Sequence, residues 1–164
     1  MKKNETDEIF NAIRNQDVEK FKLLCKVSNM NRVNVLGQSF LHIAISSKVP
    51  EIFDILMQLG ISLEILDNNG KSALHYAATH QDLVSTIILI DLVDKNAIDK
   101  NGNTALFDAY VSSKKDWNLV KKMIALGCDP YVENKFGNSV AKMVNESRNK
   151  VVLDTIQEFY DESL

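Results

Sequence analysis

The chain has 164 residues, of which 45% are hydrophobic and 25% are charged, a balance typical of a soluble globular protein of single-domain size. This composition excludes a largely disordered chain, and a formal net charge of −3 without any block of lysine and arginine argues against nucleic-acid binding. Lys2-Lys3 is followed by polar residues rather than an apolar run, so we expect neither a secretory signal nor a membrane anchor. The cytosol is therefore the expected compartment.

Apolar residues at helical spacing predict two helices in residues 5–33. Thr6 or Asp7 is expected to cap the first helix, whose apolar stripe runs through Ile9–Ile13. Asn15-Gln16-Asp17 interrupts the pattern, and a second stripe follows. A helical hairpin with a polar outer face is typical of a unit that closes the end of a stack.

The segment from Asp67 to Ala78 reads Asp-Asn-Asn-Gly-Lys-Ser-Ala-Leu-His-Tyr-Ala-Ala and recurs in altered form along the chain. Its first four residues have turn chemistry, with a glycine free to adopt a positive φ, and Ser72 can cap the helix that follows. The corresponding glycines step by 33, 32 and 35 residues and are Gly37, Gly70, Gly102 and Gly137. This register predicts repeated units.

The second halves of the units predict a second helix in each. Pro50 begins the one in the second unit and Gly60 closes it, whereas the third unit lacks a closing glycine. The fourth unit carries two extra residues between Tyr110 and Leu119, which we expect in a loop. Trp117 beside them is expected to pack on the second helix, and the alternative is an exposed residue that dominates partner binding. The final helix is predicted to bury three residues, Val152, Ile156 and Phe159.

A period near 33 in which a turn precedes Ser/Thr-x-Leu-His-x-Ala resembles the ankyrin repeat, over about Glu8 to Tyr160. The chain departs from that pattern where the family's first helical proline is replaced and where Lys48 or Gln81 replaces its mid-repeat glycine. The resemblance implies an all-α solenoid of stacked helix-turn-helix units with hairpin-like loops. We predict a single domain, 1–164, with units at about 5–33 (N-terminal cap), 34–66, 67–98, 99–133 and 134–164 (C-terminal cap).

The resemblance also implies a function, because in this family the loop tips and first helices line a concave face that binds another protein. Asp108 is a distinctive candidate because an acid stands where other units have Ile43 and Tyr76. The candidate partner-binding residues are Leu36, Gln38, Asn69, Lys71, Thr79, His80, Asn101, Asn103, Asp108, Val111, Ser112 and Phe136.

The histidines and cysteines favour structural roles. His42 and His75 stand three residues after their capping serines, at the family's structural histidine, whereas His80 has no role in the pattern. Spacings typical of a zinc site or a nucleophile motif are missing, so we expect no metal, no cofactor and no catalysis. Cys25 and Cys128 lie in the first and fourth units, too far apart for a disulfide within one molecule of an open stack.

We therefore predict a monomeric, non-catalytic protein-interaction module. The narrower alternative is a bacterial immunity protein that neutralises a toxin by binding it. A rival from another class is an enzyme that uses His80, Asp108 and Asp82. A third possibility is a structural protein that self-associates through the apolar tips Val35, Leu36 and Phe136.

Overall fold

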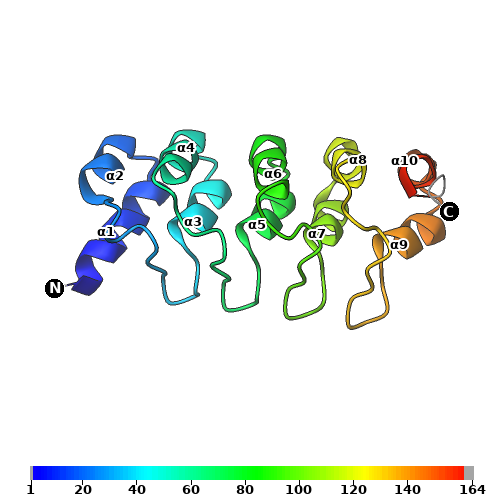
Figure 1. Cartoon of the computed structure of the whole chain (residues 1–164), viewed down its shortest axis with the longest axis horizontal. Coiled ribbons are helices and arrows are strands. Elements are labelled where there is room, and N and C mark those ends of the chain that lie inside the picture. Colours follow the sequence, from blue (N-terminus) through cyan, green and yellow to red (C-terminus); the bar gives the residue numbers. More distant parts are fainter. Residues whose placement is uncertain (1, 161–164) are drawn as a thin grey trace.

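The computed structural model describes residues 2–160 and shows helices arranged in consecutive antiparallel pairs (Figure 1). The pairs stack side by side, with the chain ends at opposite ends of the stack. The helices are α1 (Lys2–Arg14), α2 (Val18–Leu24), α3 (Phe40–Ser46), α4 (Pro50–Gln58), α5 (Ala73–Thr79), α6 (Leu83–Ile90), α7 (Ala105–Ser112), α8 (Asn118–Ala125), α9 (Val140–Ser147) and α10 (Lys150–Tyr160).

Hairpin-like loops precede α3, α5, α7 and α9 and project along the edge of the stack opposite the second helices (Figure 1). Within the described residues, β pairing is limited to two isolated bridges, Val33 with Ser39 and Ile98 with Thr104. The all-helical solenoid expected from the repeat pattern is confirmed.

Side-chain caps begin the first helices as predicted. Ser39, Thr104 and Ser139 each accept a hydrogen bond from the backbone N–H three residues later, and Ser72 forms a capping box with His75. The prediction that Thr6 or Asp7 caps the first helix is wrong, because α1 begins at Lys2. Residues 2–5 include neither proline nor glycine, so the helix runs through them.

A continuous apolar core runs through the pairs and includes Phe10 and Phe40, whose ring centroids lie 4.6 Å apart. Trp117 packs against the core as expected, but its ring is stacked on Tyr110 of the first helix, α7, with ring centroids 5.1 Å apart. Val152 and Ile156 are buried, but Phe159 is 44% exposed, so its predicted burial is wrong. Thr155, one turn earlier on the same side of α10, is buried.

Both cysteines are free and buried. Burial raises the pKa of the Cys25 thiol to about 11 and that of the Cys128 thiol to about 12. Both therefore act as small apolar core residues rather than as reactive thiolates, as their positions in the sequence indicated.

The turns between paired helices use left-handed residues other than glycine. The backbone φ is 58° at Gln16, 55° at Lys48 and at Gln81, and 53° at Arg148. The amide of Gln81 offsets part of this strain, because its Nε2 donates to Ala78 O at 3.0 Å and to Ala109 O at 2.9 Å. The family's turn geometry is therefore kept without its glycine. The two-residue insertion predicted in the fourth unit also lies in a turn, between α7 and α8.

Candidate protein-binding face

Each hairpin loop is folded by the side chain of its first residue. Asp67 Oδ1 accepts hydrogen bonds from Asn69 N at 2.8 Å and from Lys71 N at 2.9 Å. Asn34, Asp99 and Asn134 accept the corresponding pairs in the other loops. Because the acid or amide satisfies the backbone of the tip, the tip side chains are free to face outward.

The tips are joined from one unit to the next by backbone hydrogen bonds. Asn68 N donates to Leu36 O at 2.8 Å, and Lys100 N donates to Asn69 O at 2.8 Å. Lys135 N donates to Asn101 O at 2.9 Å, which continues the row to the last loop. The four tips therefore form one connected ridge rather than four independent loops.

The two histidines of the repeat pattern hold the loops to the helices. His42 Nε2 lies 3.1 Å from Lys71 O, and His75 Nε2 lies 3.1 Å from Asn103 O, so each ring contacts the next loop. Burial lowers the pKa of both rings, and each is neutral at pH 7. Their structural role, inferred from sequence, is confirmed.

The predicted binding residues differ in exposure. Asp108 is buried, 9% exposed, and five others are partly buried: Gln38, Lys71, His80, Asn103 and Ser112. The exposed ones are Leu36, Asn69, Thr79, Asn101, Val111 and Phe136. The exposed set includes tips of all four loops and the end of two first helices.

Some of the partly buried residues bond neighbouring units to each other. Gln38 Nε2 donates to Tyr76 OH at 2.6 Å, and Tyr76 OH donates to Asp67 Oδ2 at 3.0 Å. Asn134 Nδ2 donates to Asn103 Oδ1 at 2.8 Å. Gln38 and Asn103 are therefore already engaged in hydrogen bonds between units.

Asp108 forms an ion pair with Lys71 of the preceding unit, with 2.7 Å between Nζ and Oδ2. The side chains are 25% and 11% exposed for Lys71 and Asp108, so the pair is largely shielded from solvent. Asp99 Oδ2 is buried close by and has no hydrogen-bond partner among the described residues. Between the third and fourth units, the ion pair takes the place of the hydrogen bonds that Gln38, Tyr76 and Asp67 make between the second and third units.

The ends of the first helices surround a polar depression of about 430 Å³. It brings together Thr79, His80 and Ser112, three of the predicted residues, and adds Lys48 and Lys114, which sequence reasoning did not select. Burial, followed by the charge of Lys48, lowers the pKa of His80. Within residues 5–160 neither lysine forms an ion pair, so both ammonium groups are available to a ligand.

Three aliphatic residues on the loops were also missed. Val33, Leu66 and Ile98 are 45%, 52% and 55% exposed, and each directly precedes the residue that folds its loop. The available signal was the recurrence of a large aliphatic residue at one position in three successive units. Because that position lies on an exposed loop, the recurrence is not explained by burial in the core.

The residues named for a catalytic alternative are occupied elsewhere. Asp82 caps α6, accepting hydrogen bonds from Ser85 N at 3.1 Å and Ser85 Oγ at 2.7 Å, and Asp108 is paired with Lys71. His80 shares a groove with Asp82, but Asp108 does not line it. Among the described residues, histidine, cysteine and acid side chains do not gather into a group of three that could hold a metal ion.

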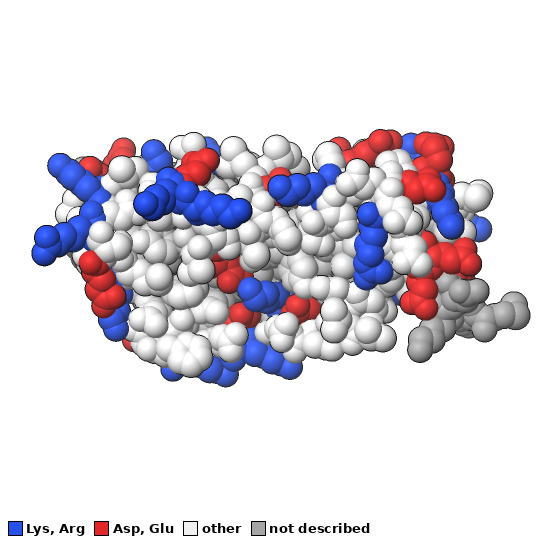
Figure 2. Space-filling model, turned by 180° about the vertical axis from the view of Figure 1, so that it is seen from behind, with Lys and Arg blue, Asp and Glu red and all other residues white. Residues whose placement is uncertain are grey.

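The face opposite the view of Figure 1 is mostly uncharged over its middle, with a small group of mixed charge below the centre (Figure 2). Lysine and arginine residues also lie along its edges. Such a surface offers uncharged contact area together with a few charges that can set specificity.

Comparison with known proteins supports the repeat assignment. The family described as "Ankyrin repeats (3 copies)" matches residues 9–91 and 60–134. The chain is 28% identical over 123 residues to a nuclear factor NF-kappa-B p105 subunit of Gallus gallus, with 73% of this chain covered. It is 27% identical over 162 residues to an intracellular phospholipase A2 of Caenorhabditis elegans, with 92% covered.

A third relative is a probable 26S proteasome regulatory subunit p28 of Saccharomyces cerevisiae, 30% identical over 137 residues, with 78% of this chain covered. The chain spans 12%, 15% and 57% of these three relatives, in the order given. The likeness is therefore to part of each relative. None of the described helices is long and apolar enough to cross a bilayer.

Proposed function

The chain belongs to the ankyrin-repeat family, and from that premise we propose that it binds another protein through its loop tips and the exposed ends of its first helices. The residues proposed to make the contact are the exposed Leu36, Asn69, Thr79, Asn101, Val111 and Phe136, together with His80 and Ser112. Gln38, Lys71, Asn103 and Asp108 are proposed to support this face rather than to contribute most of the binding energy.

The observation that carries the proposal is the connected ridge of tips. The backbone hydrogen bonds from Asn68 to Leu36, from Lys100 to Asn69 and from Lys135 to Asn101 hold exposed side chains in fixed relative positions. Because the loops are already ordered, binding a partner costs little conformational entropy. Preorganised surfaces gain affinity for that reason.

The polar depression adds specificity. Lys48, Lys114 and His80 present donors at its edge, whereas Asp116 is the acid that lines it. We infer that a partner inserts a side chain with acceptor oxygens here, and that Leu36 and Phe136 contact apolar groups at the two ends of the ridge.

We also infer that the chain has no catalytic activity, because Asp82 and Asp108 are held in structural contacts. The name of the phospholipase relative describes that protein, of which this chain spans 15%. The two free, buried thiols fit a reducing compartment such as the cytosol. Neutralising a toxin would be one form of the proposed binding, in which the captured partner is a toxin.

The experiment is affinity capture from the source cells, with wild-type protein and a Thr79→Ala, His80→Ala, Val111→Ala variant immobilised at equal density. We expect a partner that the wild type retains and the variant loses. A matched variant with Gln58→Ala and Lys122→Ala, exposed residues of the second helices, should retain it. Equal retention by all three proteins would contradict the proposal.

A further inference from the structure

The second helix of the third unit, α6, has polar residues on its buried side. Ser85 and Thr86 are 4% and 0% exposed. Ser85 Oγ donates to Asp82 Oδ2 at 2.7 Å, and Thr86 Oγ1 donates to Asp82 O at 2.7 Å. These bonds satisfy both hydroxyls, so the helix can bury them on its inner face beside Leu89 and Ile90, which are each 0% exposed.

The other apolar residues of α6 and the following turn lie on the outside. Val84, Ile88 and Leu92 are 66%, 36% and 55% exposed, and Ile87 is partly exposed. Residues 84, 87 and 88 share one side of a helix, opposite Ser85 and Thr86. We call the set Val84, Ile87, Ile88 and Leu92 the α6 stripe.

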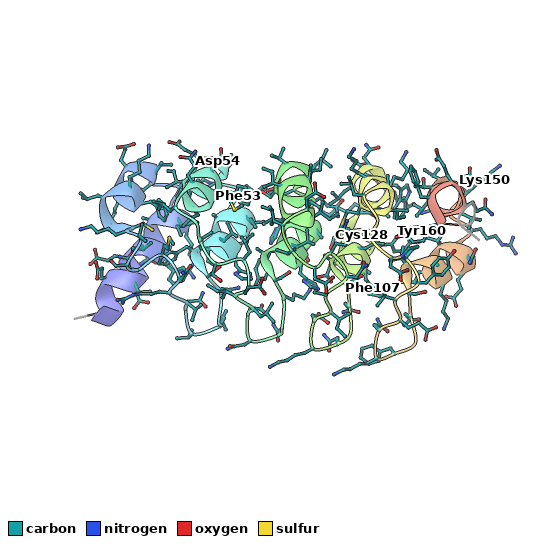
Figure 3. The ribbon with its side chains drawn as sticks, viewed as in Figure 1. Phe53, Asp54, Phe107, Cys128, Lys150 and Tyr160 are labelled. Atoms are coloured by element: carbon teal, nitrogen blue, oxygen red, sulfur yellow. The ribbon has the colours of Figure 1, made fainter. Side chains whose placement is uncertain are left out.

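At the position of Ile87 in the stripe, both neighbouring second helices carry a charged residue. The three helices align on Leu56, Leu89 and Met123, each 0% exposed. Two residues before these lie Asp54 on α4, Ile87 on α6 and Lys121 on α8. One outward position therefore reads acid, apolar, base across three adjacent helices. Figure 3 shows Asp54 at the outer edge of α4, away from the loops.

A groove of about 450 Å³ extends the stripe toward α4 and is lined partly by Phe53, Leu83 and Val84. The residues of the stripe lie outside the apolar core of the stack, whereas Phe53 on the wall of the groove belongs to that core. An apolar surface of this kind, flanked by charge, is typical of an interaction site.

We propose that the α6 stripe packs against the same stripe of a second copy of the chain, with a two-fold axis parallel to α6. A face-to-face dimer has its two-fold axis in the plane of contact. An axis parallel to α6 places α4 over α8 of the second copy, so Asp54 meets Lys121 of that copy. An axis across α6 would place Asp54 against Asp54 and Lys121 against Lys121.

The order acid, apolar, base is complementary to itself about the parallel axis. It therefore favours a second copy of the chain as the partner and also fixes its orientation. The apolar stripe supplies the contact, and the two symmetry-related pairs of Asp54 with Lys121 oppose the alternative arrangement. The exposed Asp91 side chains meet at one end of this interface, where they weaken it. With so few apolar residues, the dissociation constant should be on the order of 10 µM, as in small transient interfaces.

Sedimentation velocity over a concentration series tests the proposal. The wild type should shift from the mass of one chain toward that of two between about 1 and 300 µM, given that dissociation constant. Val84→Glu with Ile88→Lys should stay monomeric. These changes copy Glu51 and Lys122, which occupy the aligned positions of α4 and α8, so the fold should tolerate them. Val111→Glu, on the face proposed for partner binding, is the control and should dimerise like the wild type.

Charge exchange tests the orientation. Asp54→Lys and Lys121→Asp should each raise the dissociation constant at least about threefold, an effect typical of exposed pairs, and the double variant should restore it. Ile88→Cys should form a disulfide with its own copy, because the parallel axis brings position 88 next to itself, while the buried Cys25 and Cys128 stay reduced. A wild type that remains a single chain at 300 µM, or a double exchange that is no better than the singles, overturns the proposal.

Discussion

Some loop glycines lie close to the backbone of the next loop, and substitution there gives a quantitative test of the stack. A Cβ added at Gly102 would lie 2.9 Å from Lys135 N and 3.0 Å from Asn134 Cα, both backbone atoms of the next loop. A Cβ added at Gly137 would have no neighbour within 4 Å. Because the φ values are similar, 82° and 69°, the two positions differ mainly in that contact.

Gly102→Ala should therefore cost more than Gly137→Ala. Forcing an alanine into positive φ costs about 1–2 kcal/mol at either site. Displacing the next loop should add about 1–3 kcal/mol at Gly102, as overpacking does in cores. It should also strain the hydrogen bond from Lys135 N to Asn101 O. We expect totals of about 3 kcal/mol and about 1.5 kcal/mol for the two variants.

Urea denaturation followed by circular dichroism measures both values, and thermal melts provide a second reading. At this chain length each kcal/mol corresponds to about 2–4 °C in Tm. Gly60→Ala is a further control, since φ there is 74° and its Cβ would also have no neighbour within 4 Å. If Gly102→Ala were no more destabilising than Gly137→Ala, the loops would not form the connected ridge described above.

Three further predictions concern other contacts. Lys71→Gln with Asp108→Tyr copies Gln38 and Tyr76 into the next unit and gives Asp99 Oδ2 a hydrogen-bond donor. It should stabilise the fold by about 1 kcal/mol in urea denaturation, and a lower midpoint would contradict the comparison between units. Lys48→Gly should be neutral or stabilising because it relieves a positive φ, whereas Gln81→Gly at the same φ should destabilise by about 1–2 kcal/mol through loss of two hydrogen bonds. Burial holds the pKa of His42 and His75 below that of an unfolded histidine, near 6.5, so their contribution is complete above that pH and is lost as pH falls through the folded values. Melts at pH 7.5 and pH 5 should show this loss in the wild type, and a His42→Asn, His75→Asn variant should show less of it.

The register of the repeats could be predicted because each unit encodes it locally. Gly70, Ser72 and His75 fix the turn, the cap and the first contact to the next loop within nine residues of Asp67. These signals do not depend on distant parts of the chain. The same locality explains the correct prediction of Pro50 as the start of α4.

Features that depend on pairs of units could not be predicted in the same way. Asp108 looked like a binding residue because it replaced an apolar group, but its partner, Lys71, lies 37 residues earlier. Nothing in the local sequence around Asp108 specifies that pair. The six exposed candidates follow directly from the family register, which gives their positions but not what they bind.

The outward stripe on α6 escaped the sequence for another reason. A run of Val84, Ile87, Ile88 and Leu89 resembles a core helix, and hydrophobicity alone does not say which side faces the stack. The structure shows that Ser85, Thr86, Leu89 and Ile90 face the stack, which leaves Val84, Ile87 and Ile88 outside. Phe159 is a different case, since it lies on the same side of α10 as the buried Thr155, one turn further along, and is exposed because of its place near the end of the helix.

The most direct test of the proposed function is calorimetric titration of a captured partner into wild-type and variant proteins. Thr79→Ala, His80→Ala, Val111→Ala should weaken binding by more than about 2 kcal/mol, roughly 30-fold in Kd, because a few central side chains dominate interface energy. Its melting temperature should stay near that of the wild type, and Gln58→Ala, Lys122→Ala should bind as the wild type does. Loss of affinity in the Gln58, Lys122 variant but not in the triple variant would contradict binding through the tips and first helices.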